Sequence, residues 1–194
     1  MSESEARDVL DFWFAPPGHP EHDARRALWF KKDDAFDAAI RTRFGGLIER
    51  ALDGVLATWG ATTDGALAQI IVLDQFTRNV HRATPRAFAG DAQALTLART
   101  LVSSRADRTL PGVRRLFVYL PFEHAEDLQT QDESLRLFRG LGKDEPALAD
   151  LLTWAERHHA VVARFGRFPH RNAILGRTST AEEEAFLREP GSSF

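Results

Sequence analysis

Two histidines stand where the helical period of the sequence leads us to expect apolar side chains. His124 and Gln131 share an otherwise apolar stripe over residues 124–138, and His158 lies in the middle of a second stripe over residues 151–165. A single histidine on an apolar face is ordinarily a core residue with a hydrogen-bond partner. Two of them on different helices point to one polar pocket, where a neutral imidazole can accept a hydrogen bond, act as a general base or bind a metal ion.

A charged pair interrupts a third apolar stretch. Asp74 and Arg78 lie four residues apart, so they can pair on one face of a helix. Gln75 and Asn79 have the same spacing and can pair beside them. The first half of this helix is apolar nearly all round, which is typical of a buried helix, so we expect its polar second half to border an internal cavity. The alternative is an ion pair that only tethers the fold, because buried pairs are kept for many reasons.

The last third of the chain carries a local excess of arginine. Between Glu156 and Glu182 there is no acidic residue and there are five arginines: Arg157, Arg164, Arg167, Arg171 and Arg177. Arginine suits the capture of a carboxylate or phosphate through two parallel hydrogen bonds. The structural alternative is that these arginines cap helix C-termini and pair with the protein's own acids. Interleaved phenylalanines would suit RNA stacking, but a formal net charge of −3 and the lack of a recognisable nucleic-acid module argue against a nucleic-acid partner.

Helices must position all of these residues. Apolar residues recur at spacings of three and four over residues 33–56, which predicts a long helix. Gly45 and Gly46 interrupt it, so we expect close packing or a bend there. By the same period, and from caps and prolines, further helices are expected over residues 9–14, 62–81, 91–102, 111–121, 122–139 and 146–165. Residues 167–177 are expected to form an ordered loop, and Thr180 with Glu183 predicts a capping box for a last short helix.

The predicted fold is a single all-α domain over residues 1–194, built from about seven to nine helices. The sequence shows no strand-like alternation, no low-complexity linker and no repeat. The chain contains no cysteine, which excludes disulfides, thiolate metal sites and a cysteine nucleophile. The polar start and the lack of a long apolar run predict a cytoplasmic protein with no membrane partner. No GxSxG, P-loop or GxGxxG motif occurs, and no cofactor is predicted.

Three blocks of the sequence resemble one known family. They are Leu-Asp-Gln-Phe-Thr-Arg-Asn at residues 73–79, Tyr-Leu-Pro-Phe-Glu-His-Ala-Glu at 119–126 and Arg-Phe-Gly-Arg-Phe-Pro-His-Arg-Asn at 164–172. With them, the chain resembles the bacterial "domain of unknown function 924" family over residues 11–187, and the third block is a highly specific signal. The resemblance implies a helical fold similar to tetratricopeptide-like superhelices, without clean sequence repeats. It implies no established activity, so no catalytic residue is carried over.

The first functional hypothesis is a pocket that binds a small anionic molecule. Arginines would hold the anionic group, and a histidine would act as acid or base if the protein is an enzyme. The residues expected to line this pocket are Asp74, Gln75, Arg78, Asn79, His124, Gln131, His158, Arg167, His170, Arg171 and Asn172. The residue types do not identify a reaction, and whether the protein is an enzyme stays open.

Two alternatives come from other classes of protein. Tetratricopeptide-like proteins bind peptides on a concave helical surface, so the chain could be a scaffold for an acidic peptide. Exposed Arg78, Arg82 and Arg171 on a common groove would favour that protein partner. A histidine and carboxylate metal site would instead need the three pocket histidines to converge. A di-iron bundle would need a second Glu-x-x-His pair beside the one over residues 156–159.

Overall fold

The helical periods of the sequence form α-helices in the structure, which is a computed structural model and describes residues 2–192. The helices are α1 (Ser2–Phe14), α2 (Asp34–Leu52), α3 (Thr63–Ile70), α4 (Thr77–Val80), α5 (Asp91–Ser103), α6 (Gly112–Glu123), α7 (Leu128–Asp144), α8 (Leu151–Phe165) and α9 (Ala181–Leu187). Short 3₁₀ turns lie between them, and residues 2–192 contain no β-strand. The prediction of an all-α fold with about seven to nine helices is confirmed.

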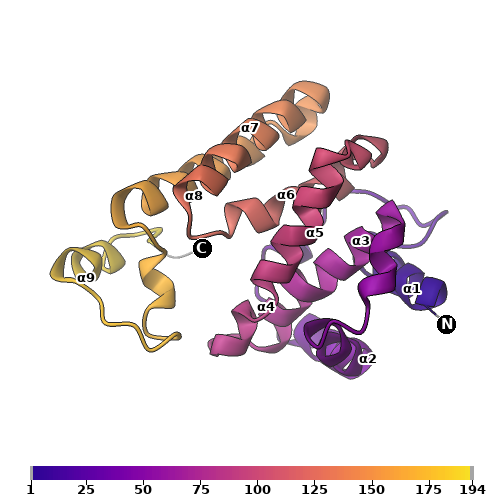
Figure 1. Cartoon of the computed structure of the whole chain (residues 1–194), viewed down its shortest axis with the longest axis horizontal. Helices are drawn as coiled ribbons and strands as arrows, with labels where there is room; N and C mark the ends of the chain where they lie inside the picture. The colour runs from indigo at the N-terminus through magenta and orange to yellow at the C-terminus, as the bar shows by residue number, and fades with distance from the viewer. Residues whose placement is uncertain (1, 193–194) are drawn as a thin grey trace.

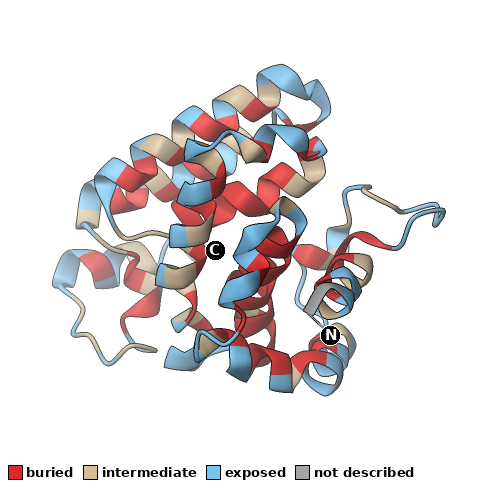
Figure 2. Cartoon of the chain, turned by 45° about the vertical axis from the view of Figure 1, so that its right-hand side comes forward, coloured by how far each residue is buried: buried red, intermediate tan, exposed pale blue. Residues whose placement is uncertain are grey.

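The helices pack side by side across the molecule (Figure 1). α7 and α8 contact each other at one edge, while α1 and α2 lie on the opposite side of the central helices. α5 contacts both α3 and α6, so it links the two sides. One hydrophobic core, which includes Trp13, Phe76 and Phe117, extends from α1 to α8. Buried residues are concentrated in the central helices, and exposed residues cover the outer faces (Figure 2).

The helical stretch at the centre of the fold, residues 63–80, is not a regular α-helix throughout. A π-helical segment, Ile71–Phe76, joins α3 to α4, and we call it the π-segment. Residues 65–77 are all buried, as expected for a stretch that is apolar nearly all round. Thr77 Oγ1, from the first residue of α4, donates a hydrogen bond to the carbonyl oxygen of Leu73 in the π-segment at 2.7 Å. π-segments occur frequently at functional sites, and this one contains Asp74.

The predicted helix over residues 33–56 is shorter in the structure. Asp33 caps the N-terminus of α2, and the helix ends at Leu52, before Gly54 turns the chain with a φ of +75°. The expectation of close packing at Gly45 and Gly46 is wrong. α2 continues through both residues, and a Cβ atom at either position would meet nothing within 4 Å.

The predicted boundary between the helices near Pro121 is also wrong. α6 continues through Pro121 to Glu123, and α7 begins only at Leu128. The Asp127 side chain accepts a hydrogen bond from the backbone N–H of Thr130 at 2.8 Å, which caps α7. The stripe that linked residue 124 to residue 131 therefore begins in the turn after α6 and continues along α7.

The C-terminal third follows the predicted pattern more closely. α8 ends at Phe165 and is followed by Gly166, which has a φ of +69°, and the loop after it contains a 3₁₀ turn, Pro169–Arg171. The capping box of Thr180 and Glu183 is present and opens α9, as predicted. None of the helices formed by residues 2–192 combines the length and the apolar character needed to cross a membrane.

Candidate functional site

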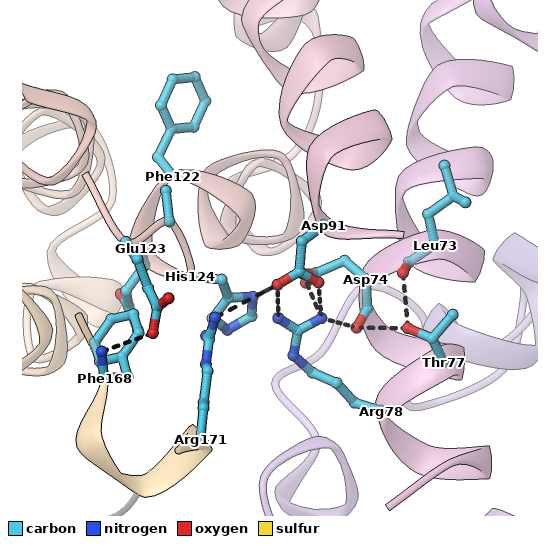
Figure 3. Close-up of polar contacts among 12 residues, drawn as sticks. Leu73, Asp74, Thr77, Arg78, Asp91, Phe122, Glu123, His124, Phe168 and Arg171 are labelled. Atoms are coloured by element: carbon cyan, nitrogen blue, oxygen red, sulfur yellow. Dashed lines mark hydrogen bonds and ion pairs between the residues drawn. The ribbon is translucent and has the colours of Figure 1, made fainter. Parts of the chain in front are cut away.

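Asp74 is the centre of a buried polar cluster (Figure 3). Its Oδ1 atom lies 2.8 Å from Arg78 Nη1 and 2.7 Å from His124 Nδ1, and its Oδ2 atom accepts a hydrogen bond from Gln75 at 2.5 Å. Burial alone would raise the pKa of Asp74, but the positive charge of Arg78 and the hydrogen bonds from His124 and Gln75 hold that pKa well below its usual range. The predicted pairing of Asp74 with Arg78 is confirmed.

Arg78 also binds a second carboxylate, which the sequence pattern did not predict. Its two terminal nitrogens donate to the two oxygens of Asp91, at 2.9 and 3.0 Å. Asp91 is the first residue of α5, and it arrives there because the preceding Gly90 lies directly against the π-segment. A Cβ atom on Gly90 would stand 2.2 Å from the carbonyl oxygen of Leu73. A glycine before an acidic helix start was the only sequence signal for this contact.

Replacing Gly90 with alanine should therefore destabilise the fold. The new methyl group overlaps backbone that cannot rotate away, so we expect a loss of about 1–3 kcal/mol in the free energy of unfolding. Gly45→Ala is the matched control, since it places a methyl group in open space within α2 and should gain up to about 1 kcal/mol. Chemical denaturation measures both, and equal stability of the two variants would contradict the close approach.

His124 directs one of its two ring nitrogens, Nδ1, to Asp74. Because Asp74 is ionised and can only accept, the ring proton of His124 is on Nδ1, and Nδ1–H donates a hydrogen bond to Oδ1. Nε2 of the neutral ring therefore carries the lone pair. Among the described residues, the hydrogen bond of the His124 ring is the one from Nδ1 to Asp74, and Nε2 makes none. Burial lowers the pKa of His124 more than Asp74 raises it, so the ring is neutral at pH 7.

A second carboxylate–histidine contact lies beside the first. Glu123 Oε1 is 3.1 Å from His158 Nδ1, which also lies 2.9 Å from the carbonyl oxygen of Trp154. The rings of His124 and His158 have centroids 6.4 Å apart. Burial, with the charge of Asp74 adding to it, raises the pKa of Glu123 to about 8, and burial lowers the pKa of His158 to about 3. Glu123 and His158 thus face each other as neutral groups at pH 7.

Arg171 reaches the cluster from the 3₁₀ turn after α8. Its guanidinium lies between the rings of Phe88 and Phe168, with its central carbon 4.8 and 4.5 Å from the two ring centroids. Burial, together with the positive charge of Arg78, lowers the pKa of Arg171 to about 10. The neighbouring His170 is also largely buried, and burial lowers its pKa to about 4.

The side chain of Arg171 makes no hydrogen bond to the described residues. Its closest ionic partner is Asp91, with 3.6 Å between Nη1 and Oδ2, and its buried Nε atom has no acceptor. Asp91 is already bound by Arg78 through both oxygens. Arg171 is thus the buried cation of this cluster whose donors remain available.

A groove of about 410 Å³ opens over these groups. Arg171, His124 and Asp91 form its polar part, together with Glu126. Its apolar walls include Pro85, Phe88, Leu95, Pro121 and Leu175. A larger hollow of about 660 Å³ lies elsewhere, next to Trp59, and none of the predicted pocket residues lines it.

Two predicted pocket residues have other partners inside the fold. Gln131 Nε2 donates to the carbonyl oxygens of Glu123 at 2.7 Å and Ala125 at 2.8 Å, so it caps the end of α6. Asn79 does not pair with Gln75 as predicted, because its amide donates to Asp37 at 2.6 Å. Gln75 stays in the cluster through Asp74 but does not line the groove.

Two further predicted residues lie on the far side of the C-terminal loop. Arg167 pairs with Glu183 of α9 at 2.7 Å, and Asn172 donates to Ser179 at 3.0 Å. Two other arginines of this region pair with the protein's own acids: Arg164 with Glu182, and Arg177 with Glu126. Most of these arginines thus pair with the protein's own acids, as the structural alternative expected, and Arg171 is the exception among the predicted pocket residues.

The geometry bears differently on the two alternative functions. The side chains of Arg78 and Arg171 are 20% and 8% exposed, and Arg82 is held by Asp37, so they do not form the exposed basic groove that an acidic peptide would need. Within residues 2–192, no group of three or more histidines and carboxylates is arranged to hold a metal ion. The histidines of the cluster contact carboxylates and backbone carbonyls instead.

Comparison with known proteins agrees with the resemblance seen in the sequence. Among solved structures, the chain is similar to a protein of unknown function, ATU0120 from Agrobacterium tumefaciens, with 36% sequence identity and a TM-score of 0.85. That similarity covers 97% of this chain and 99% of the other. No curated protein sequence matches the chain. Residues 9–191 match the family described as "Bacterial protein of unknown function (DUF924)", and the chain therefore belongs to this family.

Proposed function

We propose that the groove over His124 and Arg171 binds a small organic molecule through one anionic group. The observation that carries this proposal is the buried guanidinium of Arg171, which is fixed between two aromatic rings and donates no hydrogen bond to the described residues. A buried donor without an acceptor costs about 1–3 kcal/mol, and more when the group is charged. A carboxylate or phosphate at this position would satisfy that donor through a charge-assisted hydrogen bond.

The shape of the groove defines the rest of the ligand. Its walls are formed mainly by apolar side chains from the segment before α5, from α6 and from the C-terminal loop. A volume of about 410 Å³ lies within the range of small-molecule sites, which combine apolar walls with a few fixed polar groups. One available guanidinium suits one anionic group, so we expect a small carboxylate with an apolar body to bind better than inorganic phosphate.

Replacing Arg171 should remove the response of the protein to such anions. Sodium benzoate at ten times its dissociation constant should raise the melting temperature of the wild-type protein by about 3–6 °C over sodium chloride of equal ionic strength. Arg171→Gln should show no shift, because it removes the guanidinium that binds the carboxylate. Thermal denaturation with benzoate, and with phosphate as the smaller probe, measures both proteins.

Arg164→Gln is the matched control for this experiment. Arg164 also lies over aromatic rings, those of Phe165 and Phe186, but it pairs with Glu182 far from the groove. Its variant should keep the benzoate shift. A shift that persists in Arg171→Gln would show that the anion binds elsewhere. The cytoplasmic location and the tetratricopeptide-like arrangement expected from the sequence belong with this proposal as predictions.

A further inference from the structure

We propose that His124 takes up a proton when a carboxylate binds at Arg171, so that the groove binds the anion and the proton together. The inference rests on the proposed function and deepens it, because it names the second residue that would hold the anion. It also assigns a role to Asp74, which positions the imidazole and stabilises its charged form.

The orientation of His124 supports this coupling. Asp74 accepts from Nδ1 at 2.7 Å, so only Nε2 is available to a ligand in the groove. In the neutral ring Nε2 has a lone pair and no proton, and it cannot donate a hydrogen bond to an anion. After protonation the same atom becomes a charged donor. A bound carboxylate therefore interacts favourably with the protonated ring and unfavourably with the neutral one.

The charges that surround His124 also support proton uptake on anion binding. Asp74 from the π-segment and Asp91 from α5 carry two negative charges, and Arg78 from α4 and Arg171 from the C-terminal loop carry two positive charges. The other titratable groups packed around the ring are Glu123, Glu126, His158 and His170. Of these, the Glu126 carboxylate is neutralised by a bidentate contact to an arginine, and the other three are neutral at pH 7.

A ligand anion would thus add one unbalanced negative charge to a buried neutral cluster, which is costly without compensation. His124 is the group best placed to supply the compensating proton, because its Nδ1–H already donates to a carboxylate. His158 is less suited, since its Nδ1 donates to the carbonyl oxygen of Trp154 and burial lowers its pKa to about 3. His170 is also disfavoured, since burial and the adjacent Arg171 lower its pKa to about 4.

The coupling has a measurable consequence. If one proton binds with each anion, the affinity should fall about tenfold for each pH unit in the range where free His124 is neutral and bound His124 is charged. The linkage is reciprocal. The factor by which protonation of His124 strengthens anion binding equals the factor by which the bound anion strengthens proton binding to His124, so the anion must raise the pKa of His124.

Isothermal titration calorimetry with sodium benzoate tests the proposal. Titrations at pH 7.5 in buffers of different ionisation enthalpy give the number of protons taken up as the slope of observed enthalpy against buffer enthalpy. Wild-type protein should take up about one proton for each benzoate. His124→Gln should bind benzoate more weakly and without proton uptake. His159→Gln is the matched control, because His159 pairs with Asp132 outside the groove, and it should keep the proton uptake.

The possible outcomes separate this inference from the proposed function. Benzoate binding without proton uptake in the wild-type protein would overturn the inference and leave the proposed function standing. Uptake that persists in His124→Gln would overturn the assignment to this residue. Failure of benzoate to bind at all would overturn the proposed function and the inference with it. If His124→Gln does not fold, the ring ¹⁵N shifts of wild-type His124 answer the same question, since they must show a higher pKa with benzoate than without it.

Discussion

Replacing Asp74 with alanine should lower the free energy of unfolding by about 3–5 kcal/mol, because it breaks a buried charged network by removing one partner. The carboxylate accepts from Arg78, His124 and Gln75, and all three donors would lose their acceptor. The variant would also keep an uncompensated positive charge, since Asp91 alone would face both Arg78 and Arg171. Urea denaturation of the variant and the wild-type protein at pH 7 measures the loss.

Two further variants separate charge from cavity. Asp74→Asn keeps the volume of the side chain, so its loss of stability measures the charge and the altered hydrogen bonds. Asp150→Ala removes an aspartate that also lies 2.8 Å from an arginine, Arg25, but is 56% exposed, and it should cost less than about 1 kcal/mol. If Asp74→Ala costs no more than Asp150→Ala, the cluster does not contribute to stability.

The centre of this cluster was predictable from the sequence because its residues are close in the chain. Asp74 and Arg78 are four residues apart in a segment that is otherwise apolar, so both the pairing and the burial follow from helical spacing. Asp91 was not predictable in the same way. It meets Arg78 only because Gly90 allows α5 to approach the π-segment, and a contact between two elements leaves no period in the sequence.

The predicted set of pocket residues was too broad for a related reason. A period of 3.6 residues identifies polar side chains on an inward face, but it does not reveal what they bind. Gln131 faces inward, as its stripe indicates, and donates to the end of α6, since the chain turns between residues 124 and 127. Arg167 and Asn172 lie in the expected loop, and α9 folds back to supply Glu183 as their partner.

Two carboxylates of the same cluster are shifted in opposite directions. Asp74 pairs with Arg78 and has a depressed pKa, whereas Glu123 is buried close enough to the charge of Asp74 to be repelled by it and has a raised pKa. One buried site therefore holds a carboxylate and a carboxylic acid at pH 7. The difference comes from tertiary contacts, and the adjacent sequence Phe-Glu-His around residue 123 gave only its proximity to His124.

Glu123→Gln should stabilise the protein at neutral pH. The pKa of Glu123 is raised from 4.5 to about 8, so between these values the folded state keeps a proton that the unfolded state has lost. The contribution of Glu123 to the free energy of unfolding of the wild-type protein must therefore be most favourable below about pH 4.5 and become less favourable as the pH rises to about 8. Glutamine has the same shape and no proton to lose, so the variant should be more stable than wild type by about 3 kcal/mol at pH 7.

The pH dependence distinguishes this explanation from a general improvement in packing. The advantage of Glu123→Gln should be small at pH 4.5, grow toward pH 8 and then level off, as measured by urea denaturation across that range. Glu182→Gln, at a 62% exposed carboxylate paired with Arg164, should change stability by less than about 1 kcal/mol at every pH. In an Asp74→Asn background the upper end of the window should move below pH 8, because the charge that repels ionised Glu123 is gone. A Glu123→Gln variant that is less stable than wild type at pH 8 would show that the folded protein stabilises the Glu123 carboxylate in its ionised form.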